Sequence, residues 1–184
     1  MPIGAYMAVP HLATTLIAHR PARVLDLGLG FGMNGVAVRQ WLDLGVLPRS
    51  TFLAGVEVWP NNRSPLWKLY DVIYLQSIEE HLLNSTEKFD LIILGDVIEH
   101  FEKEIGLAIL SQVEQRLNPQ GIVFVSTPDG DMPQGAAHGN PYESHRSGWT
   151  ADDLNVRGYR ILLSAKDPQL PPAWPTLVAV FQRH

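Results

Sequence analysis

Short apolar runs alternate with longer amphipathic stretches along the chain up to residue 126. Continuous apolar runs are typical of strands buried on both faces, whereas apolar residues at helical spacing indicate helices that cover a sheet. The expected strands are 23–27, 52–58, 72–75, 91–95 and 122–126. The expected helices are 9–19, 33–43 and 99–117, the last closed by the turn sequence Asn118-Pro119-Gln120-Gly121. This alternation predicts an α/β fold with a parallel sheet and helices on both faces.

The pattern changes after residue 126. A segment rich in glycine, proline and polar residues, 127–148, precedes a short helix from Thr150 and two further strands at 159–165 and 176–182. Loops of this length in compact domains are usually lids, binding loops or disordered segments. The segment is therefore a candidate binding loop.

Composition narrows the class of protein. The chain has 184 residues, 46% of them hydrophobic, which favours one domain over residues 1–184. A formal net charge of -5 argues against a protein that mainly grips nucleic-acid phosphates. The absence of cysteine excludes disulfides, thiolate zinc sites and cysteine nucleophiles. The N-terminal residues lack the features of a signal peptide, and no apolar run has the length of a membrane span, so we expect a soluble cytoplasmic protein.

Residues 24–35, VLDLGLGFGMNG, predict a strand that turns sharply into a helix. Glycines in such a turn let the backbone approach a ligand, although a tight turn without a ligand is the alternative. The pattern G-x-G-x-x-G would need a glycine where Met33 stands, so the spacing opposes a nicotinamide oxidoreductase. Asp26 instead suits a cation, such as the amino or sulfonium group of S-adenosylmethionine. Glu57, at the end of the second strand, can accept hydrogen bonds from both hydroxyls of a ribose.

Four motifs follow one another between residues 24 and 128: DLGLGFG, GVEV, DLIILGDVIEHF and LNPQGIVFVSTP. In this order they resemble the motifs of the class I S-adenosylmethionine-dependent methyltransferases. The resemblance implies a Rossmann-like three-layer sandwich with a seven-stranded, mostly parallel sheet and an antiparallel last strand. It also implies S-adenosyl-L-methionine as the cofactor, with Glu57 on the ribose, Val58 on the adenine, and Gly95 and Asp96 beside the methionine moiety. The remaining cofactor residues implied by the resemblance are Asp26, Gly28, Gly30, Phe31 and Gly32.

The chain departs from the family pattern after the third strand. An aspartate often stands there and accepts a hydrogen bond from the adenine amino group, whereas this chain has Ser77 followed by Ile78. We expect the Ser77 hydroxyl, or Gln76, to accept the bond more weakly. The sequence Gly95-Asp96-Val97-Ile98 is not the N/D-P-P-Y/F motif, which counts against amino methylation of DNA bases.

Asp96, Glu99 and His100 have helical spacing and admit three interpretations. In the first, Asp96 caps the expected helix and Glu99 reaches back to its start. In the second, Glu99 and His100 are catalytic and remove the proton of the methyl acceptor. In the third, the three residues bind a divalent metal together with His145 or His138. The Glu-His pair and a later histidine before Trp149-Thr150 resemble the metal-dependent small-RNA 2′-O-methyltransferases.

The candidate binding loop contains aromatic and titratable residues beside its end. We interpret Tyr142 and His145 as acceptor contacts, and we expect Thr150 to cap the following helix together with Asp153. Trp59 and Trp67 are expected to pack against the sheet.

The preferred function is methyl transfer to an O or N nucleophile of a small-molecule acceptor. RNA 2′-O-methylation is the alternative within enzymes, since a nucleic-acid partner is possible though not favoured. A non-catalytic methyltransferase-like module that binds a cofactor or a partner is the alternative outside them. We expect no membrane partner.

Overall fold

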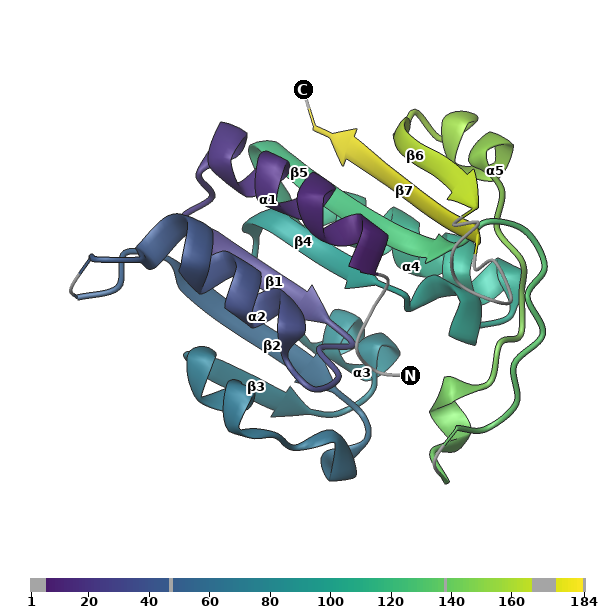
Figure 1. Cartoon of the computed structure of the whole chain (residues 1–184), viewed down its shortest axis with the longest axis horizontal. Helices are drawn as coiled ribbons and strands as arrows, with labels where there is room; N and C mark the ends of the chain where they lie inside the picture. The colour runs from purple at the N-terminus through teal and green to yellow at the C-terminus, as the bar shows by residue number, and fades with distance from the viewer. Residues whose placement is uncertain (1–5, 47, 138, 167–174, 184) are drawn as a thin grey trace.

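The computed structural model describes residues 6–46, 48–137, 139–166 and 175–183. Within them, strands form a sheet in the order β3-β2-β1-β4-β5-β7-β6 (Figure 1). The strands are β1 (Arg23–Leu27), β2 (Phe52–Glu57), β3 (Val72–Leu75), β4 (Phe89–Gly95), β5 (Leu117–Pro128), β6 (Arg160–Lys166) and β7 (Pro175–Gln182). Strand β7 pairs antiparallel with β5 and β6, and the other neighbours pair in parallel. The predicted fold class is therefore confirmed.

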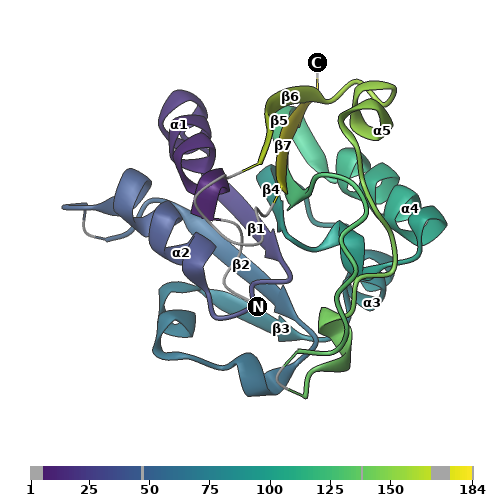
Figure 2. The ribbon, with the colours of Figure 1, turned by 45° about the vertical axis from the view of Figure 1, so that its right-hand side comes forward.

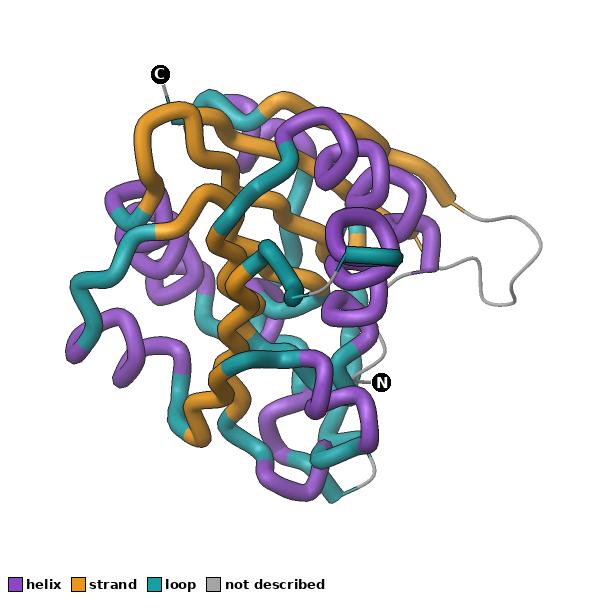
Figure 3. The backbone as a smooth tube through the Cα atoms, turned by 90° about the vertical axis from the view of Figure 1, so that its left-hand side faces the viewer, coloured by secondary structure: helices purple, strands orange, loops and turns teal. Residues whose placement is uncertain are grey.

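Helices cover both faces of the sheet, as the views in Figures 1 and 3 show. The α-helices are α1 (Val9–His19), α2 (Met33–Val38), α3 (Ile78–Asn84), α4 (Lys103–Gln115) and α5 (Ala151–Asn155). A π-helical segment, η2 (Arg39–Asp43), continues α2. Short 3-10 segments are η1 (Tyr6–Ala8), η3 (Pro60–Asn62), η4 (Pro65–Leu69), η5 (Ile98–His100) and η6 (Pro141–Glu143). None of the helices in the described ranges is long and apolar enough to cross a membrane.

Each central strand contributes side chains to two hydrophobic cores, because its side chains alternate between the faces of the sheet. On β4, Leu91 and Ile93 pack with residues of α1, α2 and η2, whereas Ile92 and Leu94 pack with residues of α3, α4 and α5. The same alternation holds along β5 from Ile122 to Val125. Burial on both faces explains why these strands appear in the sequence as continuous apolar runs.

Two predictions about elements are wrong. The helix expected at 99–117 begins only at Lys103, because residues 98–100 form a 3-10 turn and Phe101 is extended. The expected turn at 118–121 lies inside β5, where the pairing with β4 shifts and Gln120 adopts a positive φ of 66°. The helix does end before these residues, at Gln115, but they form an irregular part of the strand and not a turn.

The segment 129–150 passes along the carboxyl edge of the parallel strands (Figures 1 and 2). Its two ends meet, since Asp129 and Gly130 form β-bridges with Trp149. The Trp149 side chain is fully buried against α4, where the Lys103 ammonium lies 3.9 Å from its ring centroid. Gly106 permits this contact, because a Cβ there would lie 2.6 Å from the indole. Trp149 therefore anchors the end of this segment. The expected Thr150–Asp153 capping box is confirmed.

Candidate active site

A cavity of about 610 Å³ opens at the carboxyl edge of the sheet. Its walls come from the glycine turn after β1, the ends of β2, β4 and β5, the start of α3 and the segment 129–150. Most of the residues expected from the sequence line it: Gly28, Gly30, Glu57, Val58, Ser77, Ile78, Gly95, Asp96, Glu99 and His100. Three others do not, namely Asp26, Phe31 and Gly32. Tyr142 and His145 of the loop also face the cavity.

The glycine turn has a backbone that only glycine adopts readily. Gly28, Gly30 and Gly32 have φ values of 70°, 55° and 94°, in the left-handed region. A Cβ on Gly28 would also lie 2.6 Å from Val97 of the neighbouring loop. The turn thereby brings unhindered backbone to the cavity wall.

Glu57 sits at the end of β2 with its carboxylate held by backbone donors. Its Oε2 accepts a hydrogen bond from the Gly30 N–H and its Oε1 from the Trp59 N–H, both at 2.8 Å. Burial raises the pKa of Glu57, although these bonds and one from Asn62 oppose the rise. Each carboxylate oxygen offers more than one lone pair, so two hydroxyls on the cavity side are compatible with this arrangement.

Asp26 lies in β1 and has no exposed area. It accepts hydrogen bonds from the Tyr70 hydroxyl at 2.5 Å and from Asn34 Nδ2 at 3.0 Å. Burial raises its pKa to about 6. A ligand in the cavity therefore meets Asn34, which lines it, rather than Asp26. Phe31 is turned outward on the surface of the glycine turn.

The region after β3 is where an adenine contact is expected. Ser77 is the N-cap of α3, and its hydroxyl accepts a hydrogen bond from the Glu80 N–H at 3.1 Å. Gln76 Nε2 is 2.9 Å from His81 Nδ1, so that amide is engaged by α3. Ile78 is buried beside them and presents an apolar surface. The Ser77 hydroxyl has a capping function whatever it contributes to a ligand.

The interpretation of Asp96 as a helix cap is wrong. The 3-10 turn η5 begins after Val97 without a side-chain cap, and Asp96 has a φ of 53°. The Asp96 carboxylate instead accepts a hydrogen bond from Ser126 at 3.1 Å, while Glu99 accepts one from the Thr127 hydroxyl at 2.9 Å. The turn therefore directs both acids toward the end of β5.

Glu99 is a buried carboxyl group beside another acid. Burial and, after it, the negative charge of Asp96 raise the pKa of Glu99 well above its usual range. Backbone N–H groups of Arg146 and Ser147 donate to the Glu99 carbonyl oxygen, which ties the binding loop to η5. A cation or a shared proton at Glu99 would relieve the cost of burying this group.

The two histidines converge on Glu99. Their ring centroids lie 5.1 Å apart, with His100 Nδ1 3.3 Å from the Ser144 carbonyl and His145 Nδ1 2.6 Å from the Met132 carbonyl. A ring nitrogen can donate to a carbonyl oxygen only when it carries a hydrogen. In the neutral form of each ring, Nδ1 is therefore the donor and Nε2 the acceptor nitrogen. Burial lowers the pKa of both histidines.

These three side chains offer a compact set of ligand atoms. One donor atom from each of Glu99, His100 and His145 lies within 4.8 Å of the other two. A carboxylate and two imidazoles suit a divalent transition metal or a proton relay. His138, the other histidine considered, lies outside the described residues.

The loop contributes several residues to the cavity wall, among them Gln134, Tyr142 and His145. Gln134 and His145 cross-link it, since Gln134 Nε2 donates to the Glu143 carbonyl at 2.7 Å and the His145 N–H donates to the Gln134 carbonyl at 2.9 Å. The Tyr142 ring lies 6.1 Å from the Trp59 ring, so the loop contacts the segment after β2. Trp67 is buried and donates to the Gly30 carbonyl, as expected for a packing residue.

Sequence reasoning missed four polar residues of this site. Asn34 and Tyr70 hold Asp26, Asn62 contacts Glu57, and Thr127 contacts Glu99. Thr127 directly follows the strand predicted at 122–126, and this position was the available signal. Tyr70 is 44 residues from Asp26 along the chain, and no local pattern connects them.

Comparison with known proteins gives the family. A family model described as a methyltransferase domain matches residues 6–158. The ubiquinone biosynthesis O-methyltransferase of Azorhizobium caulinodans is 30% identical over 122 residues, which are 64% of this chain and 44% of that protein. The match thus spans less than half of that relative's length.

Solved structures share the fold. The 1,6-didemethyltoxoflavin-N1-methyltransferase of Burkholderia thailandensis, solved with 1,6-didemethyltoxoflavin and S-adenosylhomocysteine, is 21% identical with a TM-score of 0.66, over 96% of this chain and 78% of that chain. A small RNA methyltransferase is 20% identical with a TM-score of 0.66, over 97% of this chain and 25% of that chain. Since the family model covers most of the residues, the chain belongs to the methyltransferase domain family, and it has the fold of the class I S-adenosylmethionine-dependent methyltransferases.

Proposed function

We propose that this chain transfers a methyl group from S-adenosyl-L-methionine to an oxygen or nitrogen of a small molecule held in the 610 Å³ cavity. The observation that supports this most is that one cavity joins the glycine turn and Glu57 to the Glu99–His100–His145 cluster. The comparisons add support, because the curated relative is a ubiquinone biosynthesis O-methyltransferase and one structure of the same fold is a 1,6-didemethyltoxoflavin-N1-methyltransferase.

The cavity residues fit the parts of the cofactor. Glu57, with Asn62 beside it, would accept the ribose hydroxyls, and Val58 and Ile78 would pack on the adenine. Gly28, Gly95 and Asp96 would border the methionine moiety, where glycines leave room for the ligand. When bound, the cofactor would supply a methyl group on a sulfonium: the acceptor oxygen or nitrogen would attack the methyl carbon in line with the C–S bond, and S-adenosylhomocysteine would leave.

Catalysis then depends on orientation and on one proton. Orientation of two reactants can contribute about 7–11 kcal/mol to a barrier in favourable cases. His100 has its Nε2 available as an acceptor nitrogen, with Nδ1 held at the Ser144 carbonyl. We assign it as the base that takes the acceptor proton, with Glu99 beside it in the same cluster.

A second candidate function is metal-dependent methylation of an RNA 2′-hydroxyl. The geometry that favours it is the Glu99, His100 and His145 cluster, to which Asp96 is adjacent. Similarity in fold to a small RNA methyltransferase is consistent with it, while the net charge of -5 is not typical of an RNA-binding surface.

Calorimetric titration with S-adenosylhomocysteine, in EDTA and then in Mn²⁺ or Mg²⁺, tests the proposal first. We expect S-adenosylhomocysteine to bind with a micromolar dissociation constant in the absence of metal, and we expect NAD not to bind. Transfer of a labelled methyl group to a panel of phenols, hydroxamates and heterocyclic amines is then compared with transfer to a short RNA and to its 2′-deoxy counterpart. Binding without transfer to any acceptor would support a non-catalytic module, and no binding would overturn the proposal.

A further inference from the structure

The most unusual polar arrangement near the cavity is the buried carboxylate of Asp26. It lies in the middle of the sheet, paired with Gly55 of β2 on one side and Ile93 of β4 on the other. Its two hydrogen bonds come from neutral donors, the Tyr70 hydroxyl and the Asn34 amide. A charged group buried in this way needs a reason, because its desolvation is costly.

The hydrogen bond from Asn34 sets the orientation of an amide in the cavity wall. Nδ2 of Asn34 donates to Asp26 Oδ1, so the carbonyl oxygen Oδ1 of the same planar amide faces away from the carboxylate. Asn34 lines the cavity next to Gly95, where a Cβ would lie 3.1 Å from the Asn34 Nδ2. Gly95 thus leaves the amide accessible to a ligand.

Tyr70 fixes the same arrangement from behind. Its hydroxyl donates to Asp26 Oδ2 and accepts a hydrogen bond from the Gly35 N–H at 3.1 Å. Gly35 follows Asn34 in the first turn of α2, and a Cβ at this position would lie 2.6 Å from the Tyr70 ring. One phenol therefore orients both the carboxylate and the helix turn that presents Asn34.

We propose that Asn34 Oδ1 accepts a hydrogen bond from the ammonium group of the cofactor's methionine portion, and that Asp26 and Tyr70 are positioning residues that orient it. This inference rests on the proposed function. An amide oxygen is a suitable acceptor for an ammonium group, and the Asp26 carboxylate behind it adds attraction for a positive charge in a site of low dielectric. Recognition of the amino-acid end is thereby separated from recognition of the nucleoside at Glu57.

Two ligands that differ only at the amino-acid end test this assignment. S-adenosylhomocysteine has the ammonium and carboxylate groups, whereas 5′-methylthioadenosine has the same nucleoside and thioether without them. Calorimetry of the full chain with both ligands gives the ratio of their dissociation constants. We expect Asn34→Ala to raise the dissociation constant of S-adenosylhomocysteine by about tenfold or more and to leave that of 5′-methylthioadenosine unchanged.

Two further variants separate positioning from general damage. Tyr70→Phe keeps the ring but removes the hydroxyl, and we expect the same selective loss to a smaller degree. Asn61→Ala changes an exposed asparagine of η3, outside the cavity wall, and serves as the matched control with no effect on either ligand. Circular dichroism and the unfolding midpoint show whether each variant is folded.

The possible results are distinct. If the wild-type chain binds neither ligand, the proposed function fails. If it binds both and Asn34→Ala weakens them equally, or weakens neither, the assignment of Asn34 is wrong while the proposed function stands. A selective loss for S-adenosylhomocysteine in Asn34→Ala and Tyr70→Phe supports the positioning role.

Discussion

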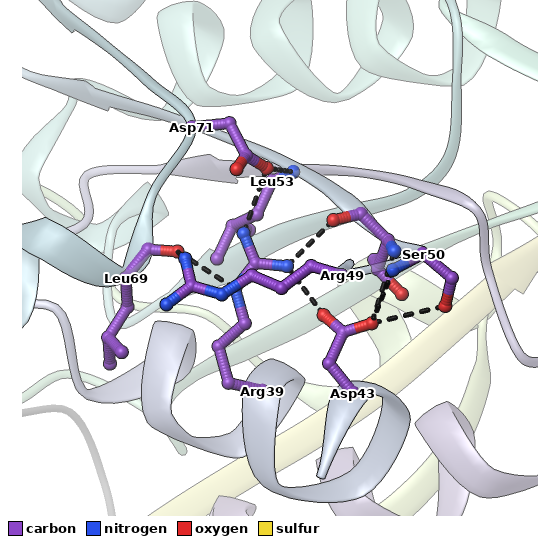
Figure 4. Close-up of polar contacts among 8 residues, drawn as sticks. Arg39, Asp43, Arg49, Ser50, Leu53, Leu69 and Asp71 are labelled. Atoms are coloured by element: carbon purple, nitrogen blue, oxygen red, sulfur yellow. Dashed lines mark hydrogen bonds and ion pairs between the residues drawn. The ribbon is translucent and has the colours of Figure 1, made fainter. Parts of the chain in front are cut away.

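The two edges of the sheet bury charged side chains in opposite ways. At the amino edge, Arg39 of η2 donates to Asp43 at 2.5 Å and to Asp71 at 2.8 Å, and also to the carbonyls of Thr51 and Leu69 (Figure 4). At the carboxyl edge, the hydrogen bonds to Glu57, Glu99 and the nearby Asp26 come from backbone N–H groups, hydroxyls and amides. The first group is held by the Arg39 guanidinium, whereas these hydrogen bonds to the second group come from neutral donors.

The pKa values follow this difference. Burial raises the pKa of Asp43, but the hydrogen bonds from Arg39, Thr51 and Ser50 outweigh it, so the pKa lies below its ordinary value. Burial dominates for Asp26 and Glu57, whose pKa values are raised. The amino edge is thus a structural clamp between η2 and the starts of β2 and β3. At the carboxyl edge, Glu57 and Glu99 line the cavity, where a ligand, a cation or a proton can reach them.

The largest expected effect is the loss of the clamp. Arg39→Met leaves Asp43 buried without its cation, and we expect the free energy of unfolding to fall by about 3–5 kcal/mol. Urea denaturation measures this loss. Arg49→Met is the control, since Arg49 is exposed and makes one long contact to the Leu69 carbonyl. Affinity of the folded Arg39→Met chain for S-adenosylhomocysteine should be unchanged, and a parallel loss of affinity would contradict the separation of the two edges.

The next effect concerns binding at the carboxyl edge. Glu57→Ala should weaken S-adenosylhomocysteine by about 2–4 kcal/mol, because two charge-assisted hydrogen bonds to the ribose are lost. Calorimetry provides the dissociation constant, and Glu87→Ala, at an exposed glutamate, is the control. Unchanged affinity in Glu57→Ala would mean that the ribose lies elsewhere.

The pH dependence of stability should have opposite signs at the two edges. Burial raises the pKa of Asp26 in the folded state to about 6 from its ordinary value of 3.8, so the folded state retains a proton that the unfolded state loses. Its ionisation lowers wild-type stability by about 2–3 kcal/mol as the pH rises from 4 to 7. Asp26→Asn removes this contribution, so the stability of the variant relative to wild type should rise over the same range.

Asp43 provides the counterpart. Its folded-state pKa is lowered, so its contribution to stability is present above the unfolded pKa and is lost as the pH falls through the folded pKa. The loss of unfolding free energy in Asp43→Asn, relative to wild type, should therefore become smaller at acidic pH. Denaturant titrations of the two variants and wild type at several pH values measure both trends. If the stability of both variants relative to wild type changed with pH in the same direction, the proposed difference between the two edges would be wrong.

The smallest predicted effect is on metal affinity. If the cluster binds a divalent cation, Glu99→Gln and His145→Ala should each weaken Mn²⁺ by at least about tenfold in calorimetry. His19→Ala, at an exposed histidine of α1 outside the cavity wall, is the matched control. A wild-type chain that binds no Mn²⁺ would leave Glu99 and His100 with the acid–base role alone.

Much of the fold and part of the candidate site could be predicted from the sequence. Apolar runs identified the strands because both faces of the sheet are covered, and the positive φ values at Gly28, Gly30 and Gly32 account for the glycines between β1 and α2. Glu57 was predicted to face the ligand site because an acid at the end of the second strand lies at the carboxyl edge of such a sheet, and it does line the cavity. These are local properties, set by neighbouring residues and by strand order.

Tertiary structure decided the rest. Asp26 was expected beside the ligand, but Tyr70, far along the chain, encloses it and leaves Asn34 at the cavity. Helical spacing suggested a cap at Asp96, whereas packing of η5 against the end of β5 turns Glu99 toward Thr127 and His145. Local patterns specify elements and their order. Which side chains meet across 40 or more residues depends on packing between elements, since burial and hydrogen bonding there involve partners that no local window contains.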